Sequence, residues 1–219
     1  MSEVTLEGIV SAPIDVDGLV RQLPLLMQTP DGWVASFGTQ VLKALIQADT
    51  YILKAESDGI KEIAVQGLPS VKVDNYGRKW ISWVDTPQTT LEEINVAGRF
   101  VFVGVTAKGI MPQLSTPNNL MYPHMIQAAL AESMLIENSP QIPDSHLVYE
   151  VFILILITFV LFILINFLGL NGSMVFTVLI FSGLSAGGVW LVKNNILIDV
   201  TYSLISAVFI SLQEYYFRF

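Results

Sequence analysis

The sequence predicts an α/β soluble head, with a mixed sheet and flanking helices, followed by an all-α region of three transmembrane helices. The membrane prediction starts from residues 151–165, VFILILITFVLFILI, where Thr158 is the one polar side chain. The apolar side chains of this run favour insertion into a bilayer by about 4 to 8 kcal/mol in total. The head prediction rests on residues 1–146, where strand-like and helix-like patterns alternate, as they do in α/β domains.

The end of the chain, residues 147–219, contains three apolar runs. They cover about residues 147–168, 174–192 and 196–212. A helix of about 20 residues crosses the hydrocarbon of a bilayer, and the first two runs have about that length. The composition of residues 169–173 predicts a turn between them. Because three is an odd number, we expect the head and Phe219 on opposite sides of the membrane.

The second run carries small residues at a spacing that permits close contact between helices. Gly183 and Gly187 form a GxxxG pair, and Gly188 follows one residue later. In lipid, such a face lets two helix backbones approach closely. We expect it to pack either between molecules or against the other two runs of the same chain. Asp199, near the start of the third run, is expected to act as an anchor or in a hydrogen bond between helices.

In the first half of the head, turn signals separate one strand from one helix. Residues 15–18 and 29–32 have turn compositions. Residues 20–27, between them, predict a strand, which Pro24 places at an edge or at a bulge. Residues 34–47 have apolar side chains at helical spacing, which predicts an amphipathic helix that covers a sheet.

The second half of the head continues the alternation of strands and helices. Residues 63–66 predict a short strand, and residues 71–84 predict a β-hairpin. Residues 90–94 and 125–136 predict helices. The continuous apolar run at residues 98–104 predicts a strand that is buried on both faces.

Charge and composition exclude several classes of function. The chain of 219 residues has a net charge of −8, and five of its charged side chains lie after residue 146, so most of the net charge belongs to the head. An acidic head without a basic stripe argues against binding to nucleic acid. The absence of cysteine excludes disulfides and thiol chemistry. With two distant histidines and neither a nucleophile–base pair nor a phosphate loop, we expect no metal, no cofactor and no enzyme activity.

The candidate ligand site is the loop at residues 106–116. It follows a predicted strand, where α/β sheets bind their ligands, and Gly104 and Gly109 are suited to bring backbone N–H groups to an anion. The alternative is a turn that needs glycine. For the candidate arginine, the alternative is a surface ion pair with Asp15 and Asp17. For the candidate histidine, it is a partly exposed polar residue at a helix start. The candidate residues are Arg21, Thr106, Lys108, Gly109, Thr116 and His124.

Four motifs follow each other in order along the chain. They are DVDGLVRQLPL at residues 15–25, VKVDNYGRKWISW at residues 71–83, GRFVFVGVTAKG at residues 98–109 with Thr-Pro at 116–117, and LIDVTY at residues 197–202. Together they resemble CHASE2 domains, which are extracytoplasmic sensory domains of bacterial receptors. The chain departs from the family pattern at Pro112, where an aspartate is common, and at the helix entry of residues 122–128.

The resemblance implies a multi-pass protein of the bacterial inner membrane. The head, residues 1–146, is then periplasmic and Phe219 is cytoplasmic. It also implies that the head is incomplete at its N-terminus and that a cytoplasmic effector module, a cyclase, kinase or phosphatase, is absent from this chain. We expect a sensory module that binds an unknown stimulus and passes it through three membrane helices to the effector. The alternative is a non-catalytic accessory or structural subunit of a larger membrane complex. We expect either self-association or a place in a membrane protein complex.

Overall fold

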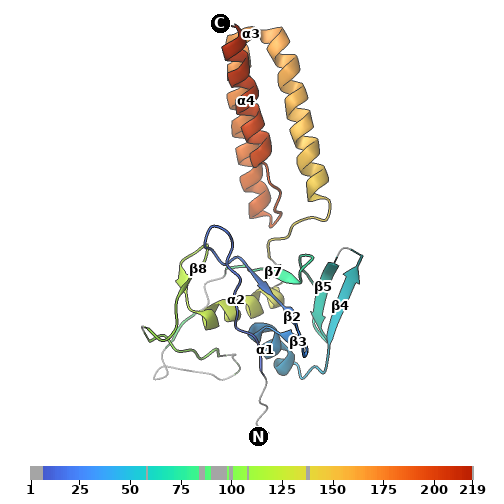
Figure 1. Ribbon diagram of the computed structural model, residues 1–219, viewed down its shortest axis with the longest axis vertical. Helices are drawn as coiled ribbons and strands as arrows, with labels where there is room; N and C mark the ends of the chain where they lie inside the picture. Colours follow the sequence, from blue (N-terminus) through green and yellow to red (C-terminus); the bar gives the residue numbers. More distant parts are fainter. Residues whose placement is uncertain are drawn as a thin grey trace. The chain divides into compact units, whose positions relative to one another are not determined.

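The computed structural model divides the chain into two compact units, Met1–Ser139 and Pro140–Phe219 (Figure 1). From here on the head means Met1–Ser139, which is shorter than the predicted head of residues 1–146, and the second unit is called the helical unit. The structure describes residues 7–57, 59–83, 87–89, 98, 101–107, 109–136 and 139–218. The head combines strands and helices and the second unit is built of helices, in the order that the sequence predicts.

The described part of the head contains nine strands. They are β1 (Gln22–Pro24), β2 (Leu26–Thr29), β3 (Gly32–Ala35), β4 (Tyr51–Glu56), β5 (Gly59–Val65), β6 (Val71–Lys72), β7 (Arg78–Trp80), β8 (Leu114–Ser115) and β9 (Leu120–Met121). They form four small antiparallel sheets, in the orders β1-β7, β2-β3, β4-β5-β6 and β8-β9. A parallel bridge joins Ile9 to Ser36.

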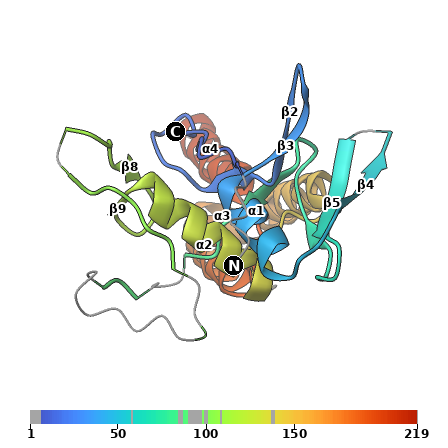
Figure 2. The ribbon, with the colours of Figure 1, turned by 90° about the horizontal axis from the view of Figure 1, so that it is seen from below.

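Two helices, α1 (Phe37–Leu45) and α2 (Pro123–Ile136), pack against each other inside the head. Figure 2 shows them together, with the β4–β5 hairpin and the β8–β9 hairpin on opposite sides. The predicted helix of residues 34–47 starts later than expected because residues 34 and 35 belong to β3 and Ser36 caps α1, accepting a hydrogen bond from the Thr39 N–H at 3.4 Å. The predicted helix of residues 125–136 is confirmed as α2.

The α1–α2 contact brings two backbones together. A Cβ added to Gly38 would lie 2.5 Å from the carbonyl oxygen of Gln127. The Gln127 side chain accepts a hydrogen bond from the Gly38 N–H at 2.9 Å, which satisfies one of the free donors at the start of α1. Around this contact lies a core whose fully buried members include Leu23, Leu25, Leu42, Ile63, Ile126 and Leu130.

The predicted hairpin of residues 71–84 is wrong in its pairing. The turn is present, because the Asp74 carboxylate accepts hydrogen bonds from the N–H groups of Tyr76 at 3.0 Å and Arg78 at 2.8 Å. The flanking strands then separate: β6 pairs with β5 and β7 pairs with β1. The strand β4 was not predicted, and it pairs along its length with β5.

The predicted buried strand of residues 98–104 is wrong in the part that the structure describes. Residues 101–104 form no strand, and Val103 is 73% exposed. Phe102 points the other way and packs edge-to-face on Phe37, with ring centroids 5.8 Å apart. One side of the run thus covers the core through Phe102, whereas Val101 and Val103 on the other side are exposed. The predicted helix of residues 90–94 lies outside the described residues.

The helical unit contains α3 (His146–Lys193) and α4 (Thr201–Arg218). The predicted turn at residues 169–173 is helical instead. The chain nevertheless doubles back within α3, since Ile157 and Ile180 pack in one cluster with Ala207 of α4. Along one straight helix, Ile157 and Ile180 would lie about 35 Å apart. Figure 1 shows α3 as two arms.

The two arms of α3 are long and apolar enough to cross a membrane. They are His146–Leu164 and Met174–Lys193, and 11% and 6% of the respective apolar windows are buried. Such low burial distinguishes them from the core helices of a water-soluble domain. The apolar part of α4, Thr201–Gln213, is shorter. Among the described residues there are thus two helices of membrane-crossing length, where the sequence predicted three.

Candidate functional site

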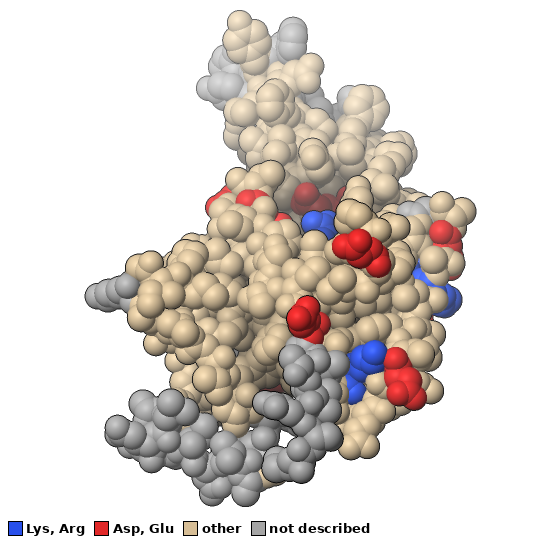
Figure 3. Space-filling model, turned by 60° about the horizontal axis from the view of Figure 1, so that its bottom comes forward, with Lys and Arg blue, Asp and Glu red and all other residues tan. Residues whose placement is uncertain are grey.

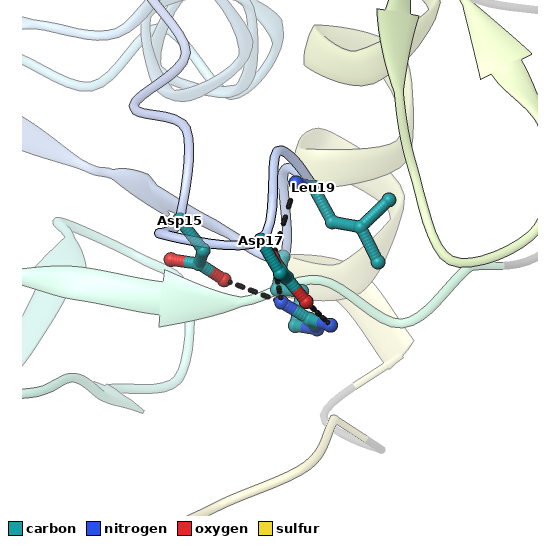
Figure 4. A network of polar contacts seen from close by, with 4 residues as sticks. Asp15, Asp17 and Leu19 are labelled. Atoms are coloured by element: carbon teal, nitrogen blue, oxygen red, sulfur yellow. Dashed lines mark hydrogen bonds and ion pairs between the residues drawn. The ribbon is translucent and has the colours of Figure 1, made fainter.

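Asp15 and Asp17, in the turn that precedes β1, both form hydrogen bonds with Arg21 (Figure 4). Its Nη1 donates to Asp15 Oδ2 and to Asp17 Oδ1, both at 2.9 Å, and its Nη2 donates to Asp17 Oδ2 at 2.5 Å. Asp17 also accepts a hydrogen bond from the Leu19 N–H at 3.2 Å. The planar guanidinium of Arg21 therefore forms two hydrogen bonds with the carboxylate of Asp17 and one with that of Asp15.

The charges of this cluster stabilise each other. The hydrogen bond from Arg21 lowers the pKa of Asp17 to about 2. Hydrogen bonds to the two carboxylates raise the pKa of Arg21. An anionic ligand would have to compete with two carboxylates for this guanidinium. The geometry corresponds to the alternative of an ion pair between Arg21 and the two aspartates. These hydrogen bonds also hold the turn of residues 15–18 in place.

The turn with Arg21 lies beside the segment that carries Thr116. The Val20 N–H donates to the carbonyl of Ser115 at 2.8 Å. The Thr116 side chain closes the β8–β9 turn, since its Oγ1 donates to the Asn119 carbonyl at 2.7 Å and accepts from the Asn119 N–H at 3.3 Å. Two candidate residues thus come from neighbouring segments, but the Thr116 hydroxyl is used within its own turn.

A second group forms where residues 101–107 contact the start of α2. The Tyr122 hydroxyl donates to the Thr106 carbonyl at 2.8 Å, and the rings of Tyr122 and His124 stack with centroids 5.9 Å apart. A Cβ on Gly104 would lie 2.1 Å from the His124 ring, so this position needs glycine. Burial lowers the pKa of His124, which favours a neutral imidazole at pH 7. Tyr122 therefore links the backbone of Thr106 to the ring of His124.

Gly109 is a turn residue. Its φ is +85°, and no described atom lies within 4 Å of the Cβ that a side chain would add. A positive φ is readily adopted by glycine and strained for most other residues. The positive φ alone accounts for a glycine at position 109, which agrees with the alternative that this loop is a turn that needs glycine. The candidate Lys108 lies outside the described residues.

One buried cation, Lys79 in β7, was missed by the sequence analysis. Its side chain is buried, Nζ donates to Ser139 Oγ at 2.5 Å, and burial lowers its pKa to about 8. The alternation of a strand carries the signal that could have found it: Lys79 points to the face opposite that of Arg78 and Trp80. Neighbouring Ile81 is likewise buried.

In the helical unit, the small-residue candidates have different surroundings. A Cβ on Gly183 or Gly187 would meet no described atom within 4 Å, whereas one on Gly188 would lie 3.2 Å from Val200 Cγ2. Gly188 therefore packs within the chain, against the loop before α4. The other two leave an open strip along the second arm of α3.

Asp199 lies in that same loop and prepares the start of α4. Its Oδ1 accepts a hydrogen bond from the Thr201 N–H at 2.8 Å, and its own N–H donates to Glu150 Oε1 at 3.0 Å. The first bond satisfies a donor of the first helical turn, and the second joins the loop to the first arm of α3.

The visible surface of the head in Figure 3 carries acidic and basic side chains side by side, with a broad uncharged area beside them. Such a mixture offers no continuous basic stripe on that face. Within the described ranges, no group of three or more His, Cys, Asp or Glu side chains is placed to hold a metal ion.

Comparison with known proteins gives one match. The model of the CHASE2 domain family matches residues 4–165, which is well over half of the chain. Neither the comparison with curated proteins nor that with solved structures found a match. The matched range runs from the head into the first arm of α3 and includes the Arg21 turn and the contact of residues 101–107 with His124. The chain belongs to the CHASE2 domain family.

Proposed function

We propose that this protein is a membrane-anchored extracytoplasmic sensory module, which binds a stimulus and passes it through membrane helices to a cytoplasmic effector. The head receives the stimulus and Phe219 lies in the cytoplasm of a bacterial cell. The protein supplies no catalysis of its own. Its partners are the membrane, further copies of itself and an effector of the cyclase, kinase or phosphatase type.

The observation that carries the proposal is the extent of the family match. It covers the head and ends at residue 165, just beyond the first apolar arm, His146–Leu164. A sensory family thus continues directly into a helix whose large side chains are mostly exposed. Exposed apolar helices of about 20 residues are matched to hydrocarbon.

The proposal takes three crossings. The doubled-back α3 supplies two of them. We assign the third to α4: its 18 residues span about 27 Å, and its apolar part, Thr201–Gln213, is the shorter stretch that would lie deepest in the hydrocarbon. With three crossings, the start of α3 and the end of α4 lie on opposite membrane faces.

Reporter fusions test the topology. Alkaline phosphatase fused after Phe219 should be inactive and a fluorescent protein fused there should fluoresce, because phosphatase folds actively outside the cytoplasmic membrane. A fusion after Asn195, in the loop between α3 and α4, is the matched control and should give the opposite pair of results. Phosphatase activity at Phe219 would reverse the proposed orientation.

A second function, as an accessory subunit of a larger membrane complex, is favoured by one feature of the head. Val101, Val103 and Val105 are 43%, 73% and 53% exposed along one segment. Contiguous exposed apolar side chains mark surfaces that contact other proteins. Native mass spectrometry of the protein extracted from its own membrane distinguishes the two functions. A stoichiometric complex with unrelated large subunits would contradict the sensory proposal, and a homo-oligomer would support it.

A further inference from the structure

A backbone clamp joins the segment that leaves the head to the loop that precedes α4. The Gln141 N–H donates to the Asn195 carbonyl at 2.9 Å, and the Leu197 N–H donates to the Gln141 carbonyl at 2.9 Å. These two bonds form a parallel bridge between Gln141 and Ile196. We call residues 141 and 195–197 the clamp. All of them belong to the helical unit.

The loop that carries residues 195–197 of the clamp is bonded to three helix ends. On one side, the Ile196 N–H donates to the Leu191 carbonyl at 3.0 Å, which fixes the loop to the last turn of α3. On the other side, Asp199 accepts from the Thr201 N–H at the start of α4 and donates to Glu150 in the first arm. The loop between α3 and α4 is thus bonded to both arms of α3 and to α4.

The clamp begins two residues after the last residue of the head. Ser139 is buried, and its hydroxyl accepts a hydrogen bond from the ammonium group of Lys79 at 2.5 Å. A single residue, Pro140, separates this anchored serine from Gln141 of the clamp. Proline fixes its own φ, so the connection has few free torsions.

We propose that the clamp transmits a displacement of the exit segment, Ser139 to Gln141, to the start of α4 through the loop as well as directly into the first arm of α3. This inference rests on the proposed sensory function. It assigns the coupling to a defined pair of backbone hydrogen bonds. A pull on Gln141 then moves the loop, and the loop moves the first turn of α4 through Asp199.

Hydrogen–deuterium exchange on the full chain in lipid nanodiscs tests the clamp. Gln141→Pro removes the N–H that bonds to Asn195. Ile142→Pro is the matched control, because it places a proline ring at the following residue and leaves both hydrogen bonds of the clamp intact. In Gln141→Pro, the amides of Leu197 and of residues 201–204 should exchange about three- to tenfold faster, as expected for the loss of a hydrogen bond. Ile142→Pro should exchange like the parent protein.

A disulfide supplies the opposite perturbation. The chain has no cysteine, so Gln141→Cys with Ile196→Cys gives a single pair, at positions that face each other in the bridge. Oxidation should slow exchange in the first turn of α4, and reduction should restore the parent rate.

Changes in exchange confined to residues 195–197, with residues 201–204 at the parent rate in both Gln141→Pro and the oxidised cysteine pair, would overturn the transmission. Neither measurement depends on a stimulus or on membrane orientation, so this failure is distinct from a reversed topology in the reporter fusions.

Discussion

The head and the helical unit treat the same apolar side chains in opposite ways. In the head, large side chains such as Leu23, Ile63 and Leu130 are fully buried. In the helical unit, Phe152, Ile155 and most of their neighbours are exposed, and the described cluster of fully or nearly buried residues is Ile157, Leu161 and Ala207. Exposing an apolar side chain to water costs free energy, whereas exposing it to hydrocarbon does not. The difference indicates that water surrounds the head, whereas hydrocarbon suits the helical unit.

The polar groups repeat the contrast. The head uses side chains to join elements that are distant in sequence, such as Gln127 to Gly38 across the two helices and Ser133 to the Ser82 N–H at 2.8 Å. In the helical unit, the hydroxyls of Thr177 and Ser211 bond to each other at 2.7 Å. Hydroxyl pairs between helices are a common way to satisfy polar groups in lipid.

Removing buried side chains tests the comparison most strongly. Leu130→Ala should destabilise the head by about 2 to 5 kcal/mol, because it leaves a cavity in a closed core. Leu156→Ala, at a position that is 48% exposed, should change stability by less than about 0.5 kcal/mol. Chemical unfolding followed by tryptophan fluorescence and circular dichroism measures both. Equal losses would mean that the helical unit has an interior of its own at Leu156.

Adding a charge tests which solvent each surface meets. Ile155→Lys places an ammonium in the middle of the first arm and should oppose membrane insertion by about 2.5 to 3.5 kcal/mol. Val103→Lys, on the exposed side of the head, should leave insertion unchanged. The measurement is the fraction of chain that resists alkaline extraction from membranes. If Ile155→Lys is retained as well as the parent protein, the first arm does not lie in hydrocarbon.

The buried cation in the head gives a pH-dependent stability. The pKa of Lys79 is about 8 in the folded protein, whereas the ordinary pKa of a lysine is 10.5, so the folded state binds fewer protons between these values. Stability should therefore rise as the pH increases from about 8 to about 10.5, by up to about 3 kcal/mol. Lys79→Met should remove the rise and be the more stable protein at pH 7. Parallel pH profiles for the two proteins would contradict this account.

The Arg21 cluster should show a smaller effect at acidic pH. Because the pKa of Asp17 is lowered from 3.8 to about 2, its contribution is fully present above about pH 4 and is lost as the pH falls toward 2. Asp17→Asn should have a flatter melting temperature profile from pH 5 to pH 2 than the parent protein. The exposed location keeps the effect small. A profile unchanged by Asp17→Asn would show that the carboxylate contributes nothing to folding.

Features that depend on a few neighbouring residues, such as turns and single helices, could be predicted from the sequence. Gly18, in the predicted turn at residues 15–18, has a φ of +85°. The helix α2 and the apolar arms of α3 follow from periodicity and composition within a short window. The grouping of Thr106 with His124 was expected only through their membership in one candidate site.

Partner choice across the chain could not be predicted in the same way. β6 and β7 flank one turn, yet each pairs with a strand of its own elsewhere in the head, because pairing depends on contacts that a local window does not contain. The apolar run around Val103 has the composition of a buried strand, but composition does not tell how many of its sides are covered. Residues 169–173 read as a turn because glycine and asparagine are weak helix formers, and tertiary context overrides that weak preference.

The reversal inside α3 has a consequence for experiments that map the protein with enzymes. No stretch of strand interrupts α3 between His146 and Lys193, although the chain reverses between its two arms. Proteases bind their substrates as extended backbone, and lipid tolerates backbone groups that are bonded internally. The tip of this helical hairpin therefore offers a protease no extended segment. Its resistance to cleavage would not show that the tip is buried in the bilayer.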